Sequence, residues 1–184
     1  METDRSLLEA ARRLDQRALV AIFDRYAVEL YNYVLRLYSD PYKADHIVGE
    51  VFSNFLEQLS AGKEARSNLR SDLYKLTYQL IAEGTHSSKH ESFLEFAAFG
   101  PDQNNGQHAT NSDPENKMLL DTVILAIKRH LTKDQRHVVV LRFLEGFSLR
   151  ETAEIVGKNI NNVRAIQNRG IANVRKVLNQ EVML

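Results

Sequence analysis

The segment SLRETAEIVGKNINNVRAIQNRG (148–170) decides the fold of the C-terminal part of the chain. Ser148 followed by Glu151 forms a capping-box pattern, in which the hydroxyl and the carboxylate each accept a hydrogen bond from a free backbone N–H at a helix start. Apolar residues then recur at helical spacing as far as Gly157. Glycine favours a helix end because it adopts the left-handed backbone conformation without steric cost. The pattern therefore predicts one short helix that ends at Gly157.

A second helix is predicted directly after that glycine, because Asn159 or Asn161 can cap its first turn. Small and apolar residues then recur every three or four positions and form one stripe, which we expect to be buried. The glycine in this stripe would let a neighbouring helix approach closely. The stripe consists of Val163, Ile166, Gly170, Val174 and Val177.

The opposite face of the second helix is mostly polar. Two helices joined by so short a turn form a helix-turn-helix unit, whose second helix fits the major groove of DNA. Arg, Asn and Gln are the side chains that make bidentate contacts with purine edges. The alternative is an ordinary solvated face without function. The residues on this face are Asn162, Arg164, Ala165, Gln167, Asn168 and Arg169.

The composition of the 184-residue chain is that of a globular protein without disulfides, since 43% of its residues are hydrophobic and none is cysteine. The first twenty residues carry charges throughout, unlike a signal peptide, and no apolar run is long enough to span a membrane. We therefore expect a soluble, cytoplasmic protein without membrane insertion.

The formal net charge is zero, but the charges are unevenly distributed. Residues 1–100 contain 15 acidic and 12 basic side chains, whereas residues 115–184 contain 7 acidic and 12 basic ones. The basic excess lies in the part that holds the candidate helix-turn-helix, which is where a nucleic-acid binder needs it. Because the excess is modest, we expect weak DNA affinity unless another protein helps to hold the DNA.

Helical periodicity predicts an all-α protein of two small helical domains joined by a flexible linker. Four helices are expected at residues 4–13, 15–39, 41–60 and 69–83, with Pro41 in a first turn and Gly84 at an end. The polar, aperiodic stretch 100–113 is typical of a tether. The C-terminal domain then holds four helices, the second of them running from a capping box at Thr132 and Gln135 to Leu144. The expected domains are 1–92 and 114–184, with residues 93–113 as the linker.

No pattern in the chain indicates an enzyme. His86 and His90 lie four residues apart, but without the surrounding residues of a zinc motif they are better explained as solvated side chains. A phosphate-binding glycine loop and a nucleophile elbow are both missing. We expect no catalytic residue, no metal and no cofactor.

Both halves resemble bacterial sigma factors. Residues 131–178 resemble the fourth conserved region of that family, and residues 18–59 resemble the second. Two regions on a short tether are typical of the extracytoplasmic-function (ECF) group of the sigma-70 family. The matching positions of the fourth region are Leu131 and Arg136, Leu141 and Arg142, Gly146 and Ser148, Glu151 and Ala153, and Val163.

The resemblance implies an alternative sigma factor, monomeric when free, that binds core RNA polymerase and promoter DNA and is controlled by an anti-sigma factor. The first domain would hold the polymerase clamp and melt the minus-ten element, and the second would recognise the minus-thirty-five element. Carried over by position, Arg164, Gln167 and Asn168 would face bases. Phosphates would be contacted by Lys158, Asn162 and Arg169.

The first domain departs from the family pattern. Lys43 and His46 replace acidic residues ahead of the clamp-binding stretch, which should weaken attraction to a basic clamp. His46 would also make binding sensitive to pH. The expected polymerase-binding residues are Asp45, His46, Glu50 and Phe52. The expected candidates for minus-ten recognition and melting are Lys63, Arg66, Asn68, Arg70 and Gln79.

Two alternatives remain open at this point. The altered clamp residues also suit a sigma-derived interaction protein, which would bind a sigma or anti-sigma factor without melting promoters. A helix-turn-helix regulator with a helical sensor domain is the third possibility. It would bind its operator tightly without polymerase, as a dimer that matches the half-site spacing.

Overall fold

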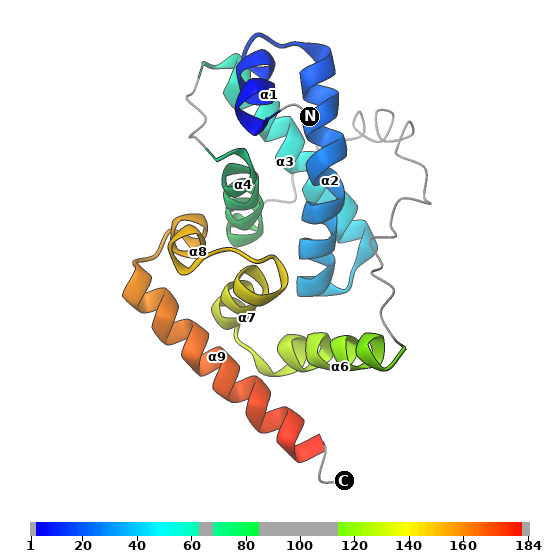
Figure 1. Ribbon diagram of the computed structural model, residues 1–184, viewed down its shortest axis with the longest axis vertical. Coiled ribbons are helices and arrows are strands. Elements are labelled where there is room, and N and C mark those ends of the chain that lie inside the picture. The colour runs from blue at the N-terminus through cyan, green and yellow to red at the C-terminus, as the bar shows by residue number, and fades with distance from the viewer. Residues whose placement is uncertain (1–2, 63–67, 85–113, 182–184) are drawn as a thin grey trace. The chain divides into compact units, whose positions relative to one another are not determined.

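The structure is a computed structural model that describes residues 3–62, 68–84 and 114–181. All regular secondary structure in these ranges is helical, as predicted, and Figure 1 follows the helices along the chain. Helices α1 to α4 form one compact unit and α6 to α9 form another, with Arg36–Ser39 at the end of α2 grouped with the second. None of the described helices is long and apolar enough to cross a membrane.

The first unit contains α1 (Asp4–Ala11), α2 (Gln16–Tyr38), α3 (Pro41–Ser60) and α4 (Leu69–Glu83). Short polar side chains fix where these helices begin. The Asp40 carboxylate accepts a hydrogen bond from the backbone N–H of Lys43 at 3.1 Å, directly before Pro41 in the first position of α3. Gly84, in the left-handed conformation, ends α4. The start of α3 and the end of α4 are therefore set by the residues next to them in the sequence, as predicted.

The core of the first unit is formed by apolar and aromatic side chains of all four helices. Tyr33 of α2 and Tyr74 of α4 are fully buried, and their rings pack with centroids 5.1 Å apart. On α4 the buried side chains include Leu73, Tyr74 and Thr77, whereas Leu76 and Leu80 are only half-buried. The Thr77 hydroxyl donates to the carbonyl of Leu73 at 2.9 Å, so its burial leaves no unsatisfied donor.

The second unit contains α6 (Pro114–His130), α7 (Lys133–Val139), α8 (Leu149–Val156) and α9 (Ile160–Glu181). The capping box predicted at Thr132 and Gln135 is present at the start of α7. The helix expected to continue to Leu144 instead changes to a π-helical turn, η2 (Val140–Leu144). Helices α7 and α9 each pack against the other helices of this unit and so join it together.

The predicted linker, residues 93–113, lies outside the described residues, as do His86 and His90. The domain boundaries 1–92 and 114–184 therefore remain predictions. The predicted arrangement of helices into an N-terminal and a C-terminal group agrees with the two compact units.

Candidate nucleic-acid interface

Helices α8 and α9 form the predicted helix-turn-helix, and each local signal has its expected partner. Ser148 and Glu151 complete a capping box: the hydroxyl accepts from the Glu151 N–H at 3.2 Å and the carboxylate accepts from the Ser148 N–H at 2.8 Å. Gly157 ends α8 in the left-handed conformation, with φ 64° and ψ 31°. The Asn159 side chain then caps α9 by accepting from the Asn162 N–H at 2.8 Å. Three residues suffice to turn the chain from one helix into the next.

The inner side of α9 rests on α7 where Gly170 faces Val139. A β-carbon added at Gly170 would lie 2.8 Å from the Val139 Cγ2 methyl, closer than side-chain carbons approach each other. The close helix approach predicted for this glycine is therefore confirmed. Val163, also on this side, is fully buried, whereas Ile166, Val174 and Val177 are half-buried. This packing fixes which face of α9 is turned outward.

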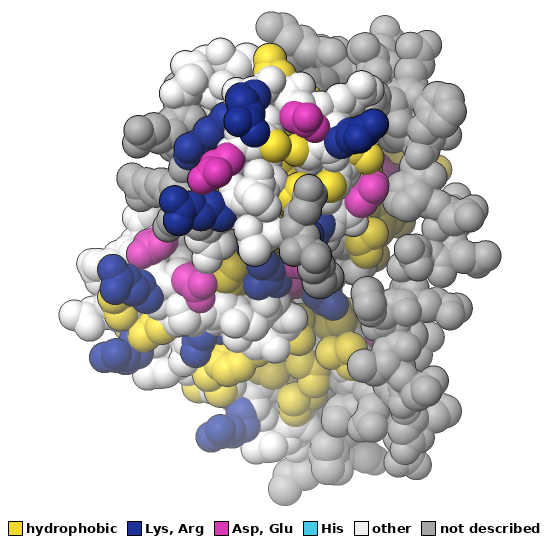
Figure 2. All heavy atoms as spheres, turned by 45° about the horizontal axis from the view of Figure 1, so that its top comes forward, with side chains coloured by type: hydrophobic (Ala, Val, Ile, Leu, Met, Phe, Trp, Pro, Cys, Tyr) yellow, Lys and Arg dark blue, Asp and Glu magenta, His cyan; other side chains and the backbone are white. Residues whose placement is uncertain are grey.

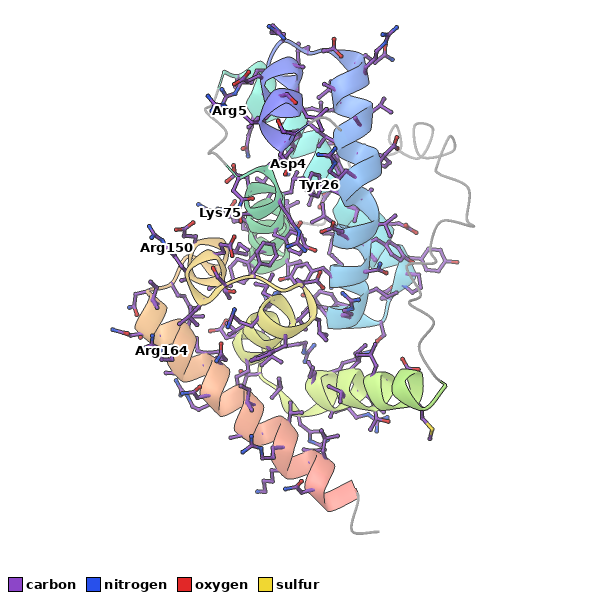
Figure 3. The ribbon with its side chains drawn as sticks, viewed as in Figure 1. Asp4, Arg5, Tyr26, Lys75, Arg150 and Arg164 are labelled. Atoms are coloured by element: carbon purple, nitrogen blue, oxygen red, sulfur yellow. The ribbon has the colours of Figure 1, made fainter. Side chains whose placement is uncertain are left out.

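The outward face of α9 presents amide and guanidinium groups to solvent. Asn162, Arg164, Asn168 and Arg169 are all exposed. Figure 3 shows Arg164 pointing away from the helices of its unit. The Nε of Arg169 donates to the carbonyl of Ala165 on the same helix at 3.3 Å. These four predicted DNA-binding residues are thus available for contacts outside the chain.

Lys158, predicted to contact phosphate, is already paired within the unit. Its ammonium lies 3.2 Å from a carboxylate oxygen of Asp134 in the first turn of α7, and both side chains are partly exposed. Exposed pairs of this kind contribute only about 0–1 kcal/mol, so a phosphate can compete for the lysine. An open hollow beside it at the turn is lined by residues that include Arg150, Glu154, Asn159, Asn161 and Asn162.

Gln167, predicted to face bases, is half-buried instead. Its side-chain oxygen accepts a hydrogen bond from the Nε of Arg142, at 2.9 Å. Arg142 lies in η2 and donates through Nη1 to the backbone carbonyl of Phe147, and its guanidinium also lies 5.8 Å from the ring centroid of Phe143. The predicted role of Gln167 as a base contact therefore conflicts with a contact inside its own unit.

In the first unit, the residues predicted to bind polymerase fall into two groups. Asp45 is exposed and His46 is half-exposed on α3, and partial desolvation raises the pKa of the Asp45 carboxyl. Glu50 is buried with one oxygen 3.6 Å from the His46 Nε2. Phe52 is buried, with its ring 4.8 Å from that of Phe23. Phe52 thus packs inside the unit, and a contact role would be limited to Asp45 and His46.

The candidates for minus-ten recognition also include both residues that contact their own unit and a residue that is exposed. Asn68 caps α4 by accepting from the Ser71 N–H at 3.1 Å. Arg70 donates to Glu29 of α2 at 2.7 Å and lies 5.2 Å from the ring centroid of Tyr74. Gln79 is exposed on α4. Lys63 and Arg66 lie outside the described residues.

Burial places one histidine of the second unit in its neutral form. His137 in α7 is buried, and desolvation, assisted by the charges of Lys133 and Arg136, lowers its pKa to about 4.

Among the residues that the structure describes, no group of three or more His, Asp or Glu side chains could hold a metal ion. In the face drawn in Figure 2, basic and acidic side chains alternate.

Sequence reasoning did not find the roles of Arg142 and Asp134. Both act on residues more than twenty positions away, Arg142 on Gln167 and Asp134 on Lys158. Arg142 belongs to the Leu-Arg step of the family pattern, which was the only signal that pointed to it.

The comparisons with known proteins agree with this geometry. The family described as "Sigma-70, region 4" matches residues 129–176, which cover α7 and α8 and most of α9. The chain is 24% identical over 172 residues to the ECF RNA polymerase sigma factor BldN of Streptomyces coelicolor, and 24% identical over 167 residues to the ECF RNA polymerase sigma factor SigX of Bacillus subtilis. Residues 129–176 thus match sigma-70 region 4, and most of the chain is similar to sigma factors of the ECF group.

The coverage of these relatives differs. The match with BldN includes 94% of this chain but only 64% of BldN, whereas the match with SigX includes 88% of this chain and 86% of SigX. The fold also matches two solved structures. CnrH, in complex with the cytosolic domain of CnrY, has a TM-score of 0.66 at 18% identity and covers 97% of this chain and 99% of its own. RpoE of Bartonella quintana, in complex with the anti-sigma factor NepR, has a TM-score of 0.59 at 17% identity, and the match covers 89% of this chain and 96% of RpoE.

Proposed function

We propose that this protein is an alternative sigma factor, which binds core RNA polymerase and directs it to specific promoters. The observation that carries the proposal is the exposed Arg and Asn face of α9, held by close packing on α7 in a segment that matches sigma-70 region 4. Members of this family regulate transcription, and the proposal requires no catalytic chemistry from the chain itself.

In this proposal the second unit recognises the minus-thirty-five element by placing α9 in the major groove. Arg164 and Asn168 lie four residues apart on one exposed face, so both can reach base edges in the same groove. Asn162, Lys158 and Arg169 would contact phosphates, which position the helix without specifying sequence. The partial positive charge at the N-terminus of α9 adds to the attraction of phosphate.

The first unit would dock onto the polymerase through the exposed side of α3. Asp45 carries the negative charge on this side, and His46 adds positive charge only when protonated. The Nε2 of His46 also lies 3.6 Å from an oxygen of the buried Glu50. A factor that works on RNA polymerase acts in the cytoplasm, where the polymerase is.

Polymerase would supply most of the affinity for promoter DNA, which explains the modest positive charge of the second unit. A bidentate side-chain contact discriminates between bases by about 1–3 kcal/mol. That is sufficient to choose among promoters already held close to the complex. We also propose control by an anti-sigma factor, because RpoE of Bartonella quintana, a structural neighbour, is bound to one.

Transcription reconstituted from the protein, core polymerase and a library of genomic promoters tests the proposal. We expect a stable complex with core and transcripts from a small set of promoters with a shared minus-thirty-five sequence. Failure to bind core would refute it. Binding to core without open-promoter formation would instead support the sigma-derived interaction protein, which the similarity to SigX over 88% of this chain does not favour.

A further inference from the structure

Three structural elements of the second unit meet at one guanidinium. Arg142 projects from the π-helical turn η2, donates through Nε to the Gln167 side chain on α9 at 2.9 Å, and donates through Nη1 to the carbonyl of Phe147. Phe147 directly precedes the residue that caps α8. The arginine therefore joins η2, the start of α8 and the middle of α9.

This arrangement occupies the atom that Gln167 needs for base recognition. A glutamine recognises adenine with its oxygen and its nitrogen together, in a bidentate contact. Here the oxygen already accepts from a charged donor, and hydrogen bonds to charged groups are stronger than neutral ones. The half-buried position of Gln167 also directs the side chain toward its own unit, unlike the exposed Arg164 and Asn168 on either side of it.

We propose that Gln167 is a positioning residue, which with Arg142 fixes α9 against η2 and the start of α8, and that Arg164 and Asn168 are the side chains that select bases. The inference rests on the proposed function, since it assumes that α9 lies on promoter DNA. It deepens that function because it assigns sequence selection to two residues and orientation of the helix to the Arg142–Gln167 pair.

The first experiment compares two substitutions at position 167 in the full chain bound to core polymerase. Gln167→Glu keeps an oxygen that accepts from Arg142, whereas Gln167→Leu removes it. Base preference is measured with promoters randomised across the minus-thirty-five element. We expect Gln167→Glu to keep the wild-type preference at every position, with a uniform loss of affinity from its added negative charge.

Gln167→Leu should reduce discrimination at all positions that α9 contacts, because the helix loses the hydrogen bond that complements its packing on α7 and holds it more precisely. Asn168→Ala serves as the matched control on the same face, and it should lose roughly tenfold discrimination at one position only. A role that is merely structural would lower stability in Gln167→Leu without changing the discrimination ratio. Loss of preference at a single position in Gln167→Glu would overturn the proposal and restore Gln167 as a base contact.

Amide hydrogen exchange of the free protein tests the Arg142–Gln167 pair without DNA. We expect exchange of the α9 amides in the turns around Gln167 to be roughly tenfold faster in Gln167→Leu and unchanged in Gln167→Glu, since a hydrogen bond to a charged group is lost only in the former. Equal exchange in both variants and the wild type would refute the pair as an anchor. If wild-type holoenzyme shows no base preference at all while the exchange result holds, the proposed function fails and the anchoring role stands.

Discussion

Replacement of Gly170 by alanine should have opposite effects in two backgrounds, because the site combines a helix position that favours alanine with a contact that excludes it. The added β-carbon would lie 2.8 Å from the Val139 Cγ2 methyl, whereas ordinary contacts begin at 3.4 Å. The two helices must therefore separate by about 0.6 Å or the valine must leave its rotamer. Valine in a helix has one strongly preferred χ1, so it adapts poorly.

The magnitude follows from two opposing effects on the free energy of unfolding. Forcing an extra carbon into a packed core typically costs about 1–3 kcal/mol. Alanine in place of glycine inside a helix returns about 1 kcal/mol. We therefore expect Gly170→Ala to destabilise the second unit by up to about 2 kcal/mol. In a Val139→Ala background the obstructing methyl is absent, and the same substitution should stabilise by about 1 kcal/mol.

Chemical denaturation of the wild type, both single variants and the double variant gives the full cycle. The second unit should be followed by a probe of its own, such as amide exchange of α7 and α9, because the two units need not unfold together. A favourable coupling of about 1–3 kcal/mol between the two substitutions is expected. Additive effects, or stabilisation by Gly170→Ala alone, would show that α7 and α9 are not in close contact at this point.

Three further predictions concern charge. Asp134→Asn should raise the affinity for duplex DNA roughly threefold at low salt, because Lys158 loses its internal partner and a negative charge that repels the DNA phosphates is removed. Fluorescence anisotropy across a salt series measures this affinity, and weaker binding would contradict the prediction. Arg164→Ala in the holoenzyme should relax base preference at one promoter position by about 1–3 kcal/mol, whereas Arg175→Ala, a matched change farther along α9, should leave preference intact in a promoter-selection assay. The pKa of His137 is lowered to about 4 from 6.5, so between these pH values the unfolded chain binds more protons than the folded chain. The free energy of unfolding is therefore highest above about pH 6.5 and falls as the pH falls. The loss at pH 5 should be about 2 kcal/mol in denaturation curves, and His137→Gln should remove this dependence.

The elements of this fold that were predictable from sequence are those set by neighbouring residues. The cap at Ser148, the left-handed glycines and the proline in the first turn of α3 each act within four residues, so the sequence alone carries the information. The helix-turn-helix also followed from local signals, because two predicted helices were separated by only a short turn. The exposed Arg164 and Asn168 also follow from helical periodicity once Val163 is taken as buried.

The remaining features depend on packing between distant residues. The contact of Arg142 with Gln167 requires α9 to cross the π-helical turn at one particular point, and no local pattern encodes that. Phe52 was expected to bind polymerase because it belongs to the clamp-binding motif, and its ring packs on Phe23 of another helix. An aromatic residue in a motif is equally compatible with either role until the neighbouring helix is placed.

Helix α9 continues for about three turns beyond Gly170, since it ends at Glu181. The C-terminal part of α9 therefore extends beyond the face that we propose for DNA recognition. The chain contains no cysteine, so Lys176→Cys would create a single thiol on an exposed position about 18 Å along the axis from Arg164. A dye attached there would report distances to labelled promoter DNA and so follow the engagement of the helix in real time.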